Sequence, residues 1–414
     1  MSDHLPPKPW MTEPKVSVVI AALRAAGGEA RFVGGCVRDA LLRFPVNDID
    51  LATTLTPDAV VAALAKAKIR AVPTGLDHGV VTAIVDGVPF EVASLRRDVE
   101  TDGRRAVVAF TTDWAEDAQR RDFRLNALYA DPDGTLHDPT GGGLADARAG
   151  RVVFVGDAET RIREDTLRIL RFFRFQAWFG RGEPDAEALA ACARLKDSLA
   201  TLPAERISKE FLKLLAAEDP RAVIRLMAAI GVLGLILPKT QGLEVFDRLV
   251  GIQTEQLFEE DAGIRLAALL PPDPAAAKAL ARTLRLSNDL RDRLVAALGD
   301  GPVITSYLSP REARRAIYQL GHAAFRDRVK LGWARAERTA TTPQWRALLA
   351  LADSWSAPPF PISGEEVVQA GVPVGPMVGR VLKEVEAWWI DHDFIDDKFS
   401  AIERLKAVAQ GLAY

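Results

Sequence analysis

The chain has little cysteine: only Cys36 and Cys192 occur in 414 residues, with no C-x-x-C spacing. A disulfide framework needs several cysteines and a zinc ribbon needs close pairs, so both are excluded. This usage is typical of the cytosol, and we expect a cytoplasmic protein. The first residues lack the positive, apolar and small pattern of a secretory signal. No apolar run approaches the ~20 residues of a membrane span, so we expect no membrane partner.

Histidine and net charge are also low. The five histidines are scattered, and only His392-Asp393 forms a His-Asp pair. An HD-type phosphohydrolase needs several such residues in one helical domain, so that activity is excluded. The net charge of −3 excludes a uniformly basic nucleic-acid-binding protein, but a local basic face would still suffice. The length predicts about two to four domains, each able to bury a core.

The most informative stretch covers residues 31–51. An apolar segment ends in Gly34-Gly35, and a short helix is predicted over residues 36–42. Two glycines allow backbone N–H groups to approach a phosphate, and the following helix adds its positive N-terminal end. On its own, however, a Gly-Gly pair is usually just a turn.

Asp48 and Asp50 then lie two residues apart in a strand-like segment. Alternate residues of a strand share one face, so both carboxylates are predicted to point the same way. Alone, an Asp-x-Asp pattern is more often a solvated loop or a calcium site. Paired carboxylates beside a phosphate-binding turn are what a Mg²⁺-dependent nucleotidyl transfer needs, because the metal neutralises the triphosphate and activates the attacking hydroxyl.

Other segments predict a mixed α/β region built on a small sheet. Residues 1–12 are Pro-rich and are predicted to be disordered. Asp86-Gly87 is a strong hairpin signal between two β-rich runs. Thr56 is a plausible N-cap for the helix that follows it. The predicted helices cover residues 15–26 and 57–66, and the predicted strands cover residues 79–85 and 88–93.

A second motif is Arg120-Arg-Asp-Phe-Arg-Leu-Asn-Ala-Leu128. Its two leading arginines offer forked donors for triphosphate oxygens. Asp122 and Asn126 would share one face if the segment is helical, and both could then accept hydrogen bonds from ribose hydroxyls. The alternative is an ordinary Arg–Asp helix surface.

A third motif lies in the arginine-rich segment 158–176. Asp165 and Arg168 are three residues apart, so a continuous helix would place them on one face. The alternative is an amphipathic helix with an i,i+4 pair between Glu164 and Arg168. A further helix is predicted from Pro203, with Arg206 and Glu210 bracing the structure rather than reacting.

Together and in this order, the motifs resemble the polymerase-β nucleotidyltransferase superfamily, and more narrowly the class II tRNA CCA-adding enzymes and related poly(A) polymerases. The resemblance is strong over residues 27–215, weak over the body and moderate over the Gly-rich turn 371–379, which resembles a tail that contacts the tRNA elbow. It implies an α+β fold with a small mixed-sheet head followed by an all-helical neck, body and tail. The implied divisions are 1–26, 27–155 for the head, 156–225 for the neck, 226–355 for the body and 356–414 for the tail.

The resemblance also implies roles for individual residues. The implied catalytic carboxylates are Asp48, Asp50 and Glu91, and the first two would bind the metal. The implied base-reading pair is Asp165 and Arg168. The implied nucleotide-binding residues are Gly34, Gly35, Arg38, Arg121, Asp122, Asn126, Asp165, Arg168 and Arg171. Arg124 departs from the family pattern, which has Thr at this position. For Glu91, a solvent-facing strand position is the alternative.

The implied function is a Mg²⁺-dependent nucleotidyltransferase that adds C, C and A to the tRNA 3′ end from CTP and ATP, releasing pyrophosphate. A poly(A) polymerase, an enzyme adding only CC or A, and a non-catalytic RNA-binding protein are the alternatives. The stretch Thr74–Thr82 resembles the CCA type rather than the Arg-rich poly(A) type. Residues 97–112 resemble a flexible loop used when the final A is added. The segment 138–146 resembles the hinge that joins head and neck. A plain linker is the alternative interpretation.

Overall fold

A computed structural model of the chain describes residues 4–6, 8–76, 79–102, 105–336 and 341–411. The chain divides into two compact units, residues 1–238 and 239–414. Among the described helices, none has the length and apolarity that a membrane crossing requires. The finer division into head, neck, body and tail remains a prediction.

A mixed sheet forms the centre of the head. Within the described residues, seven strands form it in the order β3-β4-β5-β2-β1-β8-β9. Their bounds are β1 Ala30–Val33, β2 Asp50–Thr53, β3 Arg70–Gly75, β4 Val80–Val85, β5 Val88–Ser94, β8 Tyr129–Ala130 and β9 Leu136–His137. Strand β2 runs parallel to β5, and the other neighbouring pairs are antiparallel. The predicted mixed-sheet head is therefore confirmed.

The turn between β4 and β5 is the predicted hairpin. Asp86 and Gly87 both have positive φ, 47° and 78°. Two left-handed residues are what a two-residue turn needs to match the twist of its strands, and Asp-Gly accepts this conformation at low cost. This hairpin brings β5 beside β2, which is the pairing that builds the candidate site.

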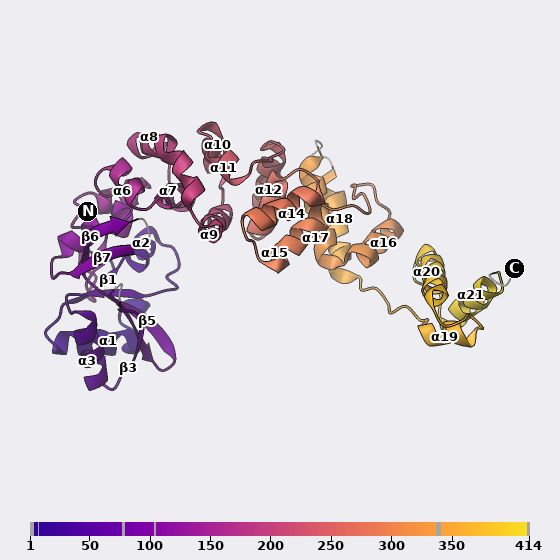
Figure 1. Cartoon of the computed structure of the whole chain (residues 1–414), viewed down its shortest axis with the longest axis horizontal. Coiled ribbons are helices and arrows are strands. Elements are labelled where there is room, and N and C mark those ends of the chain that lie inside the picture. Colours follow the sequence, from indigo (N-terminus) through magenta and orange to yellow (C-terminus); the bar gives the residue numbers. More distant parts are fainter. Residues whose placement is uncertain (1–3, 7, 77–78, 103–104, 337–340, 412–414) are drawn as a thin grey trace. The chain divides into compact units, whose positions relative to one another are not determined.

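Helices α1 (Pro14–Ala25) and α3 (Pro57–Lys66) pack against each other and on the sheet (Figure 1). Both helices were predicted, and their buried positions recur with helical spacing. Thr56 is the N-cap residue of α3, as predicted, but its side chain makes no capping hydrogen bond. Pro57 at the first helical position needs no N–H partner, which reduces the need for such a cap.

The disorder predicted for residues 1–12 is wrong for their described part. The backbone N–H of Leu5 donates to the Gly134 carbonyl at 2.8 Å, and the Leu5 side chain is buried. The Trp10 ring packs edge-on against Phe32 of β1 with centroids 4.8 Å apart. Apolar side chains between the prolines thus anchor the segment, including the short helix η1 (Pro9–Met11).

A two-stranded ribbon replaces the flexible loop expected over residues 97–112. Strands β6 (Arg96–Asp102) and β7 (Arg105–Phe110) pair antiparallel, with a register shift between residues 98 and 100. Residues 103 and 104 of this segment lie outside the described residues, as do residues 77 and 78 of the CCA-type stretch. The β-branched and apolar residues of β7 favour a strand over a loop.

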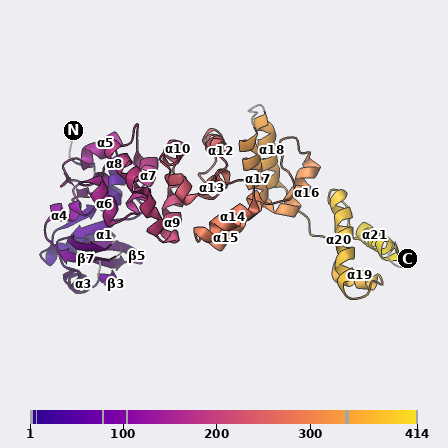
Figure 2. The same cartoon turned by 45° about the horizontal axis from the view of Figure 1, so that its top comes forward.

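Helices make up the rest of the first unit. Helix α7 lies beside α9 (Figure 2). The Phe172, Phe173 and Phe175 side chains of α7 are buried. The bounds are α2 Gly35–Leu42, α4 Trp114–Gln119, η3 Arg124–Asn126, α5 Gly143–Ala149, α6 Ala158–Glu164, α7 Arg168–Phe179, α8 Ala186–Leu195, η4 Lys196–Thr201, α9 Ala204–Leu215, α10 Arg221–Ala229 and α11 Val232–Ile236. The predicted all-helical region after the head is confirmed.

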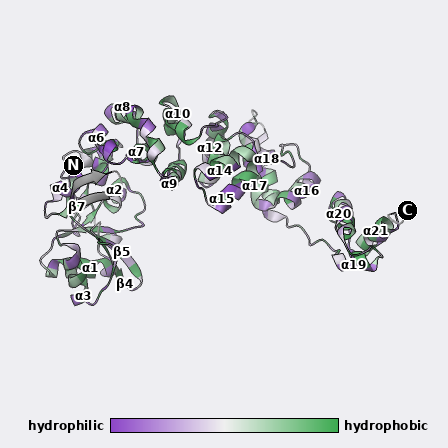
Figure 3. Ribbon diagram, viewed as in Figure 1, coloured by the Kyte–Doolittle hydropathy of each residue, from purple (hydrophilic) through white to green (hydrophobic). Residues whose placement is uncertain are grey.

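The second unit is helical throughout its described part. Its central helix is α17, which contacts α12, α13, α15, α16 and α18. Figure 3 shows hydrophobic residues on α14 and α17 and hydrophilic residues on α15 and α16. The bounds are α12 Glu244–Glu255, α13 Ala262–Leu269, α14 Pro274–Thr283, α15 Asn288–Leu298, α16 Pro310–Leu320, α17 His322–Arg335 and α18 Thr342–Ser354.

The last three helices form a small cluster with its own core. They are α19 (Gly364–Gln369), α20 (Pro376–Asp391) and α21 (Lys398–Gly411). The Trp389 side chain is 1% exposed, and its indole N–H donates to the Asp396 carbonyl. A buried indole whose N–H is paired belongs to the core rather than to a stacking surface.

Candidate active site

Gly34 joins β1 to α2 in a backbone conformation that glycine adopts far more readily than other residues. Its φ is 70° and its ψ is −118°. A Cβ at this position would lie 3.5 Å from the Arg121 guanidinium. Helix α2 begins at Gly35 without a side-chain cap, so N–H groups of its first turn are available to an anion. The predicted Gly-Gly turn into a helix is confirmed.

Three carboxylates line one cavity of about 630 Å³ at the end of the sheet. Asp50 is the first residue of β2 and stands opposite Glu91 of β5 in the parallel register. Asp48 precedes the strand, so the prediction of a strand through both aspartates is wrong at Asp48. On the β1 side, Asp48 has no described strand residue opposite it, because β1 ends at Val33. Asp48 nevertheless lines the same cavity.

A buried thiol links the start of α2 to Asp50. The Cys36 Sγ lies 3.7 Å from the Asp50 carbonyl oxygen and 3.4 Å from that of Val33. Burial raises the pKa of Cys36 to about 12, so the thiol stays protonated at neutral pH. The first turn of α2 is therefore held against the strand that carries the carboxylate.

The charge around Asp50 fits a divalent cation. Burial, followed by the nearby carboxylates of Glu91 and Asp48, raises the pKa of Asp50 from 3.8 to about 6. Hard cations such as Mg²⁺ prefer carboxylate oxygens and would offset this repulsion. Within the described residues, no three His, Cys, Asp or Glu side chains form a ready-made metal site. A cation here would therefore complete its shell with water and substrate oxygens.

Arg121 is fixed from behind by two buried groups. Its Nη2 donates to the Asp117 carboxylate at 2.8 Å, and its Nε lies 3.3 Å from the Tyr129 hydroxyl. The Tyr129 hydroxyl donates to the same carboxylate at 2.7 Å. The neighbouring guanidinium groups of Arg121 and Arg120 hold the pKa of Asp117 at about 2 despite its burial. The guanidinium therefore lies beside Gly34, and its positive charge also acts on the Asp50 carboxylate.

Asp122 and Asn126 do meet, although no continuous helix joins them. Asp122 precedes the short helix η3, and the Asn126 amide donates to its carboxylate at 3.0 Å. The Arg171 Nε donates to the other carboxylate oxygen at 2.7 Å. The side-chain amide oxygen of Asn126 in turn accepts a hydrogen bond from Arg38 at 2.6 Å. A hydrogen-bonded chain from α2 to α7 therefore joins four of the predicted nucleotide-binding residues.

Aromatic rings of α7 support this chain of polar groups. The Arg38 guanidinium lies over the Phe179 ring, 4.2 Å from its centroid. The Phe175 ring faces the guanidinium groups of Arg38, Arg171 and Arg174. Burial lowers the pKa of Arg38. Arginine nevertheless keeps its charge in proteins, and these cation–π contacts stabilise that charge where water is excluded.

The predicted continuous helix over 158–176 is broken at Asp165. Helix α6 ends at Glu164, Asp165 is extended with a φ of −148°, and α7 starts at Arg168. Asp165 and Arg168 therefore do not share one helical face. The Arg168 guanidinium contacts the Glu164 carboxylate at 2.5 Å, which is the i,i+4 pair considered from the sequence. The Asp165 side chain makes a different contact.

That contact is made by α9. The Arg206 Nη2 lies 3.0 Å from the Asp165 carboxylate, and the Arg174 Nε donates to Glu210 at 2.6 Å. The predicted bracing role of Arg206 and Glu210 is thus consistent with the contacts, but the two residues bind the segment containing α7 rather than each other.

The sequence reading missed Asp117 and Tyr129 as residues that position Arg121. One local signal existed: Asp117 precedes Arg120 by three residues and Arg121 by four, a spacing that favours ion pairs on a helix. No sequence pattern placed Tyr129 there, because its approach depends on β8 pairing with β1.

Comparisons with known proteins agree with this geometry. A family described as "Poly A polymerase head domain" matches residues 30–153, and one described as "Probable RNA and SrmB- binding site of polymerase A" matches residues 183–243. A mitochondrial CCA tRNA nucleotidyltransferase 1 from Mus musculus is 33% identical over 385 residues, which cover 91% of this chain and 86% of that protein. The CCA-adding enzyme of Latilactobacillus sakei is 31% identical over 373 residues, covering 89% and 91%.

Solved structures show the same fold. The CCA-adding enzyme of Bacillus stearothermophilus in complex with CTP superposes with a TM-score of 0.74 at 25% identity, covering 96% of this chain and 97% of that one. The Thermotoga maritima CCA-adding enzyme complexed with tRNA gives a TM-score of 0.68 at 21% identity over 96% of each chain, a likeness of fold. The chain belongs to the class II CCA-adding enzymes of the tRNA nucleotidyltransferase and poly(A) polymerase family.

Proposed function

We propose that this chain adds C, C and A to the 3′ end of tRNA from CTP and ATP without a nucleic-acid template, releasing pyrophosphate. The observation that carries the proposal is the parallel pairing of Asp50 with Glu91 at one cavity, with Cys36 in the first turn of the uncapped helix α2 in contact with Asp50. A turn suited to phosphate binding close to paired carboxylates supports nucleotidyl transfer. The names of the relatives, which include enzymes solved with CTP, ATP and tRNA, support the substrates.

In this proposal Asp48 and Asp50 bind Mg²⁺, and Glu91 is the third carboxylate of the site. Divalent-metal chemistry is general to the family, and the all-oxygen donor set favours Mg²⁺ over softer metals. When bound, the cation would neutralise the triphosphate and lower the pKa of the attacking 3′-hydroxyl. The contribution of the chain is to hold the carboxylates together at the strand ends.

The phosphates of the nucleotide would lie on the first turn of α2. The N–H groups after Gly34 and Gly35 supply donors at the positive end of the helix, and Arg38 and Arg121 supply charge nearby. Arg121 already has its orientation fixed by Asp117, so little rearrangement is needed when the triphosphate arrives. Asp122 and Asn126 would face the ribose, with Arg171 holding Asp122 in place.

Asp165 and Arg168 would read the base. A carboxylate only accepts hydrogen bonds, and a guanidinium only donates them. Asp165 forms an ion pair with Arg206, and Arg168 forms one with Glu164. In this proposal these ion pairs orient the two groups that contact the base.

We further propose a cytoplasmic location, supported by two unpaired cysteines that are both buried. The decisive test of function is an assay on tRNA shortened at successive 3′ positions, with each nucleoside triphosphate supplied separately. CTP incorporation on tRNA lacking CCA, followed by one A, supports CCA addition. Long tails from ATP alone would instead make the chain a poly(A) polymerase. Stopping after CC, or adding A only, would make it a partial enzyme.

A further inference from the structure

A second cavity lies in the C-terminal unit. It has a volume of about 610 Å³, which falls in the range of small-molecule pockets. Its walls come from the end of α15, the segment 299–307, one face of α17 and Trp345 of α18. Every lining residue belongs to the C-terminal unit, so this cavity is distinct from the carboxylate site.

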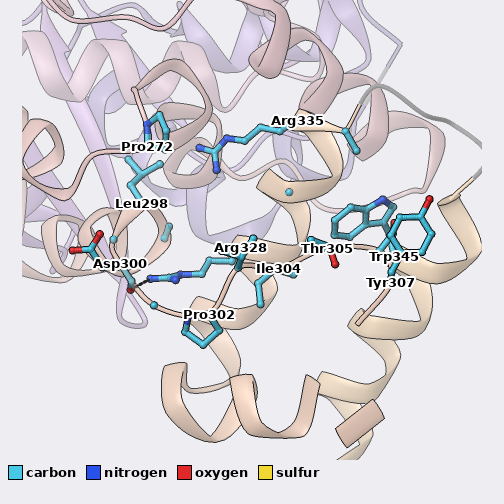
Figure 4. A pocket seen from close by; sticks show the side chains of 17 residues that line it. Pro272, Leu298, Asp300, Pro302, Ile304, Thr305, Tyr307, Arg328, Arg335 and Trp345 are labelled. Carbon is cyan, nitrogen blue, oxygen red and sulfur yellow. Dashed lines mark hydrogen bonds between the residues drawn. The ribbon is translucent and has the colours of Figure 1, made fainter. Parts of the chain in front are cut away.

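Two arginines reach into this cavity from α17. Arg328 and Arg335 are seven residues apart, two helical turns, so they share one face of the helix. In Figure 4 their guanidinium groups extend in the same direction, away from Tyr307 and Trp345. The Asp300 carboxylate is the acidic group among the described lining residues, so positive charge exceeds negative charge around the cavity.

The two guanidinium groups differ in their partners. The Arg328 Nε donates to the Ala296 carbonyl at 2.8 Å, and its Nη2 donates to the Asp300 carbonyl at 2.9 Å. The Arg335 Nε and Nη2 are buried, and within the described part of the chain neither has a hydrogen-bond partner. Arginine keeps its charge in proteins, and buried charged donors without an acceptor are both rare and destabilising. Among the described residues, these two nitrogens of Arg335 therefore lack an acceptor.

The opposite end of the cavity is aromatic and open. The Tyr307 side chain is 73% exposed, while Trp345 is buried, with its indole N–H donating to Thr341. Gly332 keeps space between α17 and this end, because a Cβ there would lie 3.1 Å from the Trp345 ring. An exposed ring at the mouth of a pocket offers a stacking surface to a planar group.

We propose that this cavity binds a mononucleotide-sized organic phosphate, with the phosphate on Arg335 and the planar ring against Tyr307. The forked donors of Arg335 match phosphate oxygens, and Arg328, which also lines the cavity, adds a second positive charge. Inorganic phosphate alone would leave the aromatic end empty, and a neutral ring would leave Arg335 without an acceptor. Only a ligand with both parts uses both ends.

The chain offers a local probe for this site. It contains four tyrosines, Tyr129, Tyr307, Tyr318 and Tyr414, so a chain labelled with 3-fluorotyrosine gives four ¹⁹F signals. The Tyr307 signal is assigned by its loss in Tyr307→Phe. AMP is titrated into the full-length labelled chain without tRNA, and inorganic phosphate is titrated separately. Binding in the head would be reported by Tyr129 instead, which lies beside Arg121.

We expect AMP to shift the Tyr307 signal saturably, and inorganic phosphate to compete only at higher concentration. Arg335→Gln should weaken this binding at least tenfold, and Tyr307→Ala, followed by competition with labelled AMP, should weaken it several-fold. The matched control is Arg326→Gln, which removes the same charge from α17, where it pairs with Asp353 outside the cavity. It should leave AMP affinity unchanged.

Stability separates a ligand site from a structural arginine. Arg335→Gln removes a half-buried charge whose Nε and Nη2 have no acceptor among the described residues, so the unfolding temperature of the variant should equal or exceed that of the parent chain. A clear fall in unfolding temperature, with AMP affinity preserved in Tyr307→Ala, would overturn the proposal. It is equally overturned if AMP leaves the Tyr307 signal unmoved while a tRNA titration shifts it, since the cavity would then belong to an RNA-binding surface.

Discussion

Asp50 and Glu91 stand opposite each other on the parallel strands β2 and β5. They come from distant parts of the sequence, and the β4–β5 hairpin brings them together. Two carboxylates in such a position repel each other, so the fold maintains this pairing at a cost to its own stability. A cation-binding function gives a reason for that cost, and it leads to measurable consequences at Asp50.

Replacing either predicted metal ligand should stop catalysis without disturbing tRNA binding. We expect Asp48→Ala and Asp50→Ala each to lower turnover by several orders of magnitude, with tRNA affinity within a few-fold of the parent, because the metal acts on the reaction rather than on RNA recognition. Single-turnover CTP incorporation and tRNA titration measure the two effects. Asp58→Asn, on the exposed start of α3, is the control. Near-normal turnover in either alanine variant would contradict the assignment.

The raised pKa of Asp50 predicts that Asp50→Asn stabilises the metal-free protein. In the folded chain its pKa is about 6, against 3.8 ordinarily, so the folded state binds a proton more tightly than the unfolded state. This favours folding below about pH 4, and the advantage is lost as the pH rises through 6. At pH 7.5 with EDTA, removing the charge should raise the free energy of unfolding by on the order of 2 kcal/mol.

The gain should shrink as the pH falls from 6 toward 4, and it should also shrink when Mg²⁺ is added to the parent protein. Chemical denaturation at several pH values measures both trends. A variant that is less stable than the parent at pH 7.5 would show that Asp50 makes a favourable contact, contrary to the expected repulsion.

Local signals in the sequence predicted the turns of the head correctly. Gly34 and Gly87 have positive φ, and residues that tolerate this conformation are few, so a glycine beside a strand pattern restricts the fold strongly. The α1 and α3 helices were predictable for a similar reason, since their apolar residues recur with a helical period. Glu91 was likewise predicted on the second strand of the hairpin, where the structure places it.

Contacts between distant segments were not predictable in the same way. The period of apolar residues continues across Asp165, so the pattern gave no sign of the break between α6 and α7. The Asp165 carboxylate at the break binds Arg206, which is 41 residues further along the chain. Tyr129 reaches Asp117 only because β8 joins the sheet. These partners are set by tertiary packing, which overrides local propensity.

Asp117 should control how well the nucleotide is held. In Asp117→Asn, the buried Arg121 keeps its charge but loses the carboxylate that orients it. We expect the free energy of unfolding to fall by about 3 kcal/mol, as when one partner of a buried ion pair is removed, and the KM for CTP and ATP to rise. Tyr129→Phe, which removes only the hydroxyl, should have the same direction and a smaller size. An unchanged KM in a folded Asp117→Asn protein would contradict the positioning role.

The β6–β7 ribbon should matter most for the last nucleotide. The Arg96 backbone N–H at its base lies 3.3 Å from the Asp117 carboxylate, so the ribbon is tied to the group that orients Arg121. Replacing residues 98–109 by a short turn should preserve CC addition and depress A addition. Stepwise addition to tRNA ending before and after CC separates the two rates. If both rates fall equally and the unfolding temperature drops, the ribbon has a structural role instead.

The strongest prediction concerns base choice by Asp165 and Arg168. Cytosine and adenine both present an exocyclic amine, which a carboxylate can accept, and a ring nitrogen acceptor, to which a guanidinium can donate. Uracil presents a carbonyl and a ring N–H at these positions, so both contacts would become unpaired or repulsive. A site that leaves buried polar groups unpaired can discriminate by ~10⁴-fold.

Asp165→Ala should therefore slow CTP and ATP incorporation and raise the relative use of UTP and GTP, and Arg168→Ala should do the same with a larger overall loss. Arg163→Ala removes an exposed charge from α6 and is the matched control. Because Arg206 holds Asp165 before the base arrives, Arg206→Gln should slow all reactions while keeping the preference for C and A. Single-turnover rates with all four nucleotides distinguish these outcomes. If both alanine variants slow down with the parent's preference intact, Asp165 and Arg168 act only through their ion pairs with Arg206 and Glu164, and base selection must lie elsewhere.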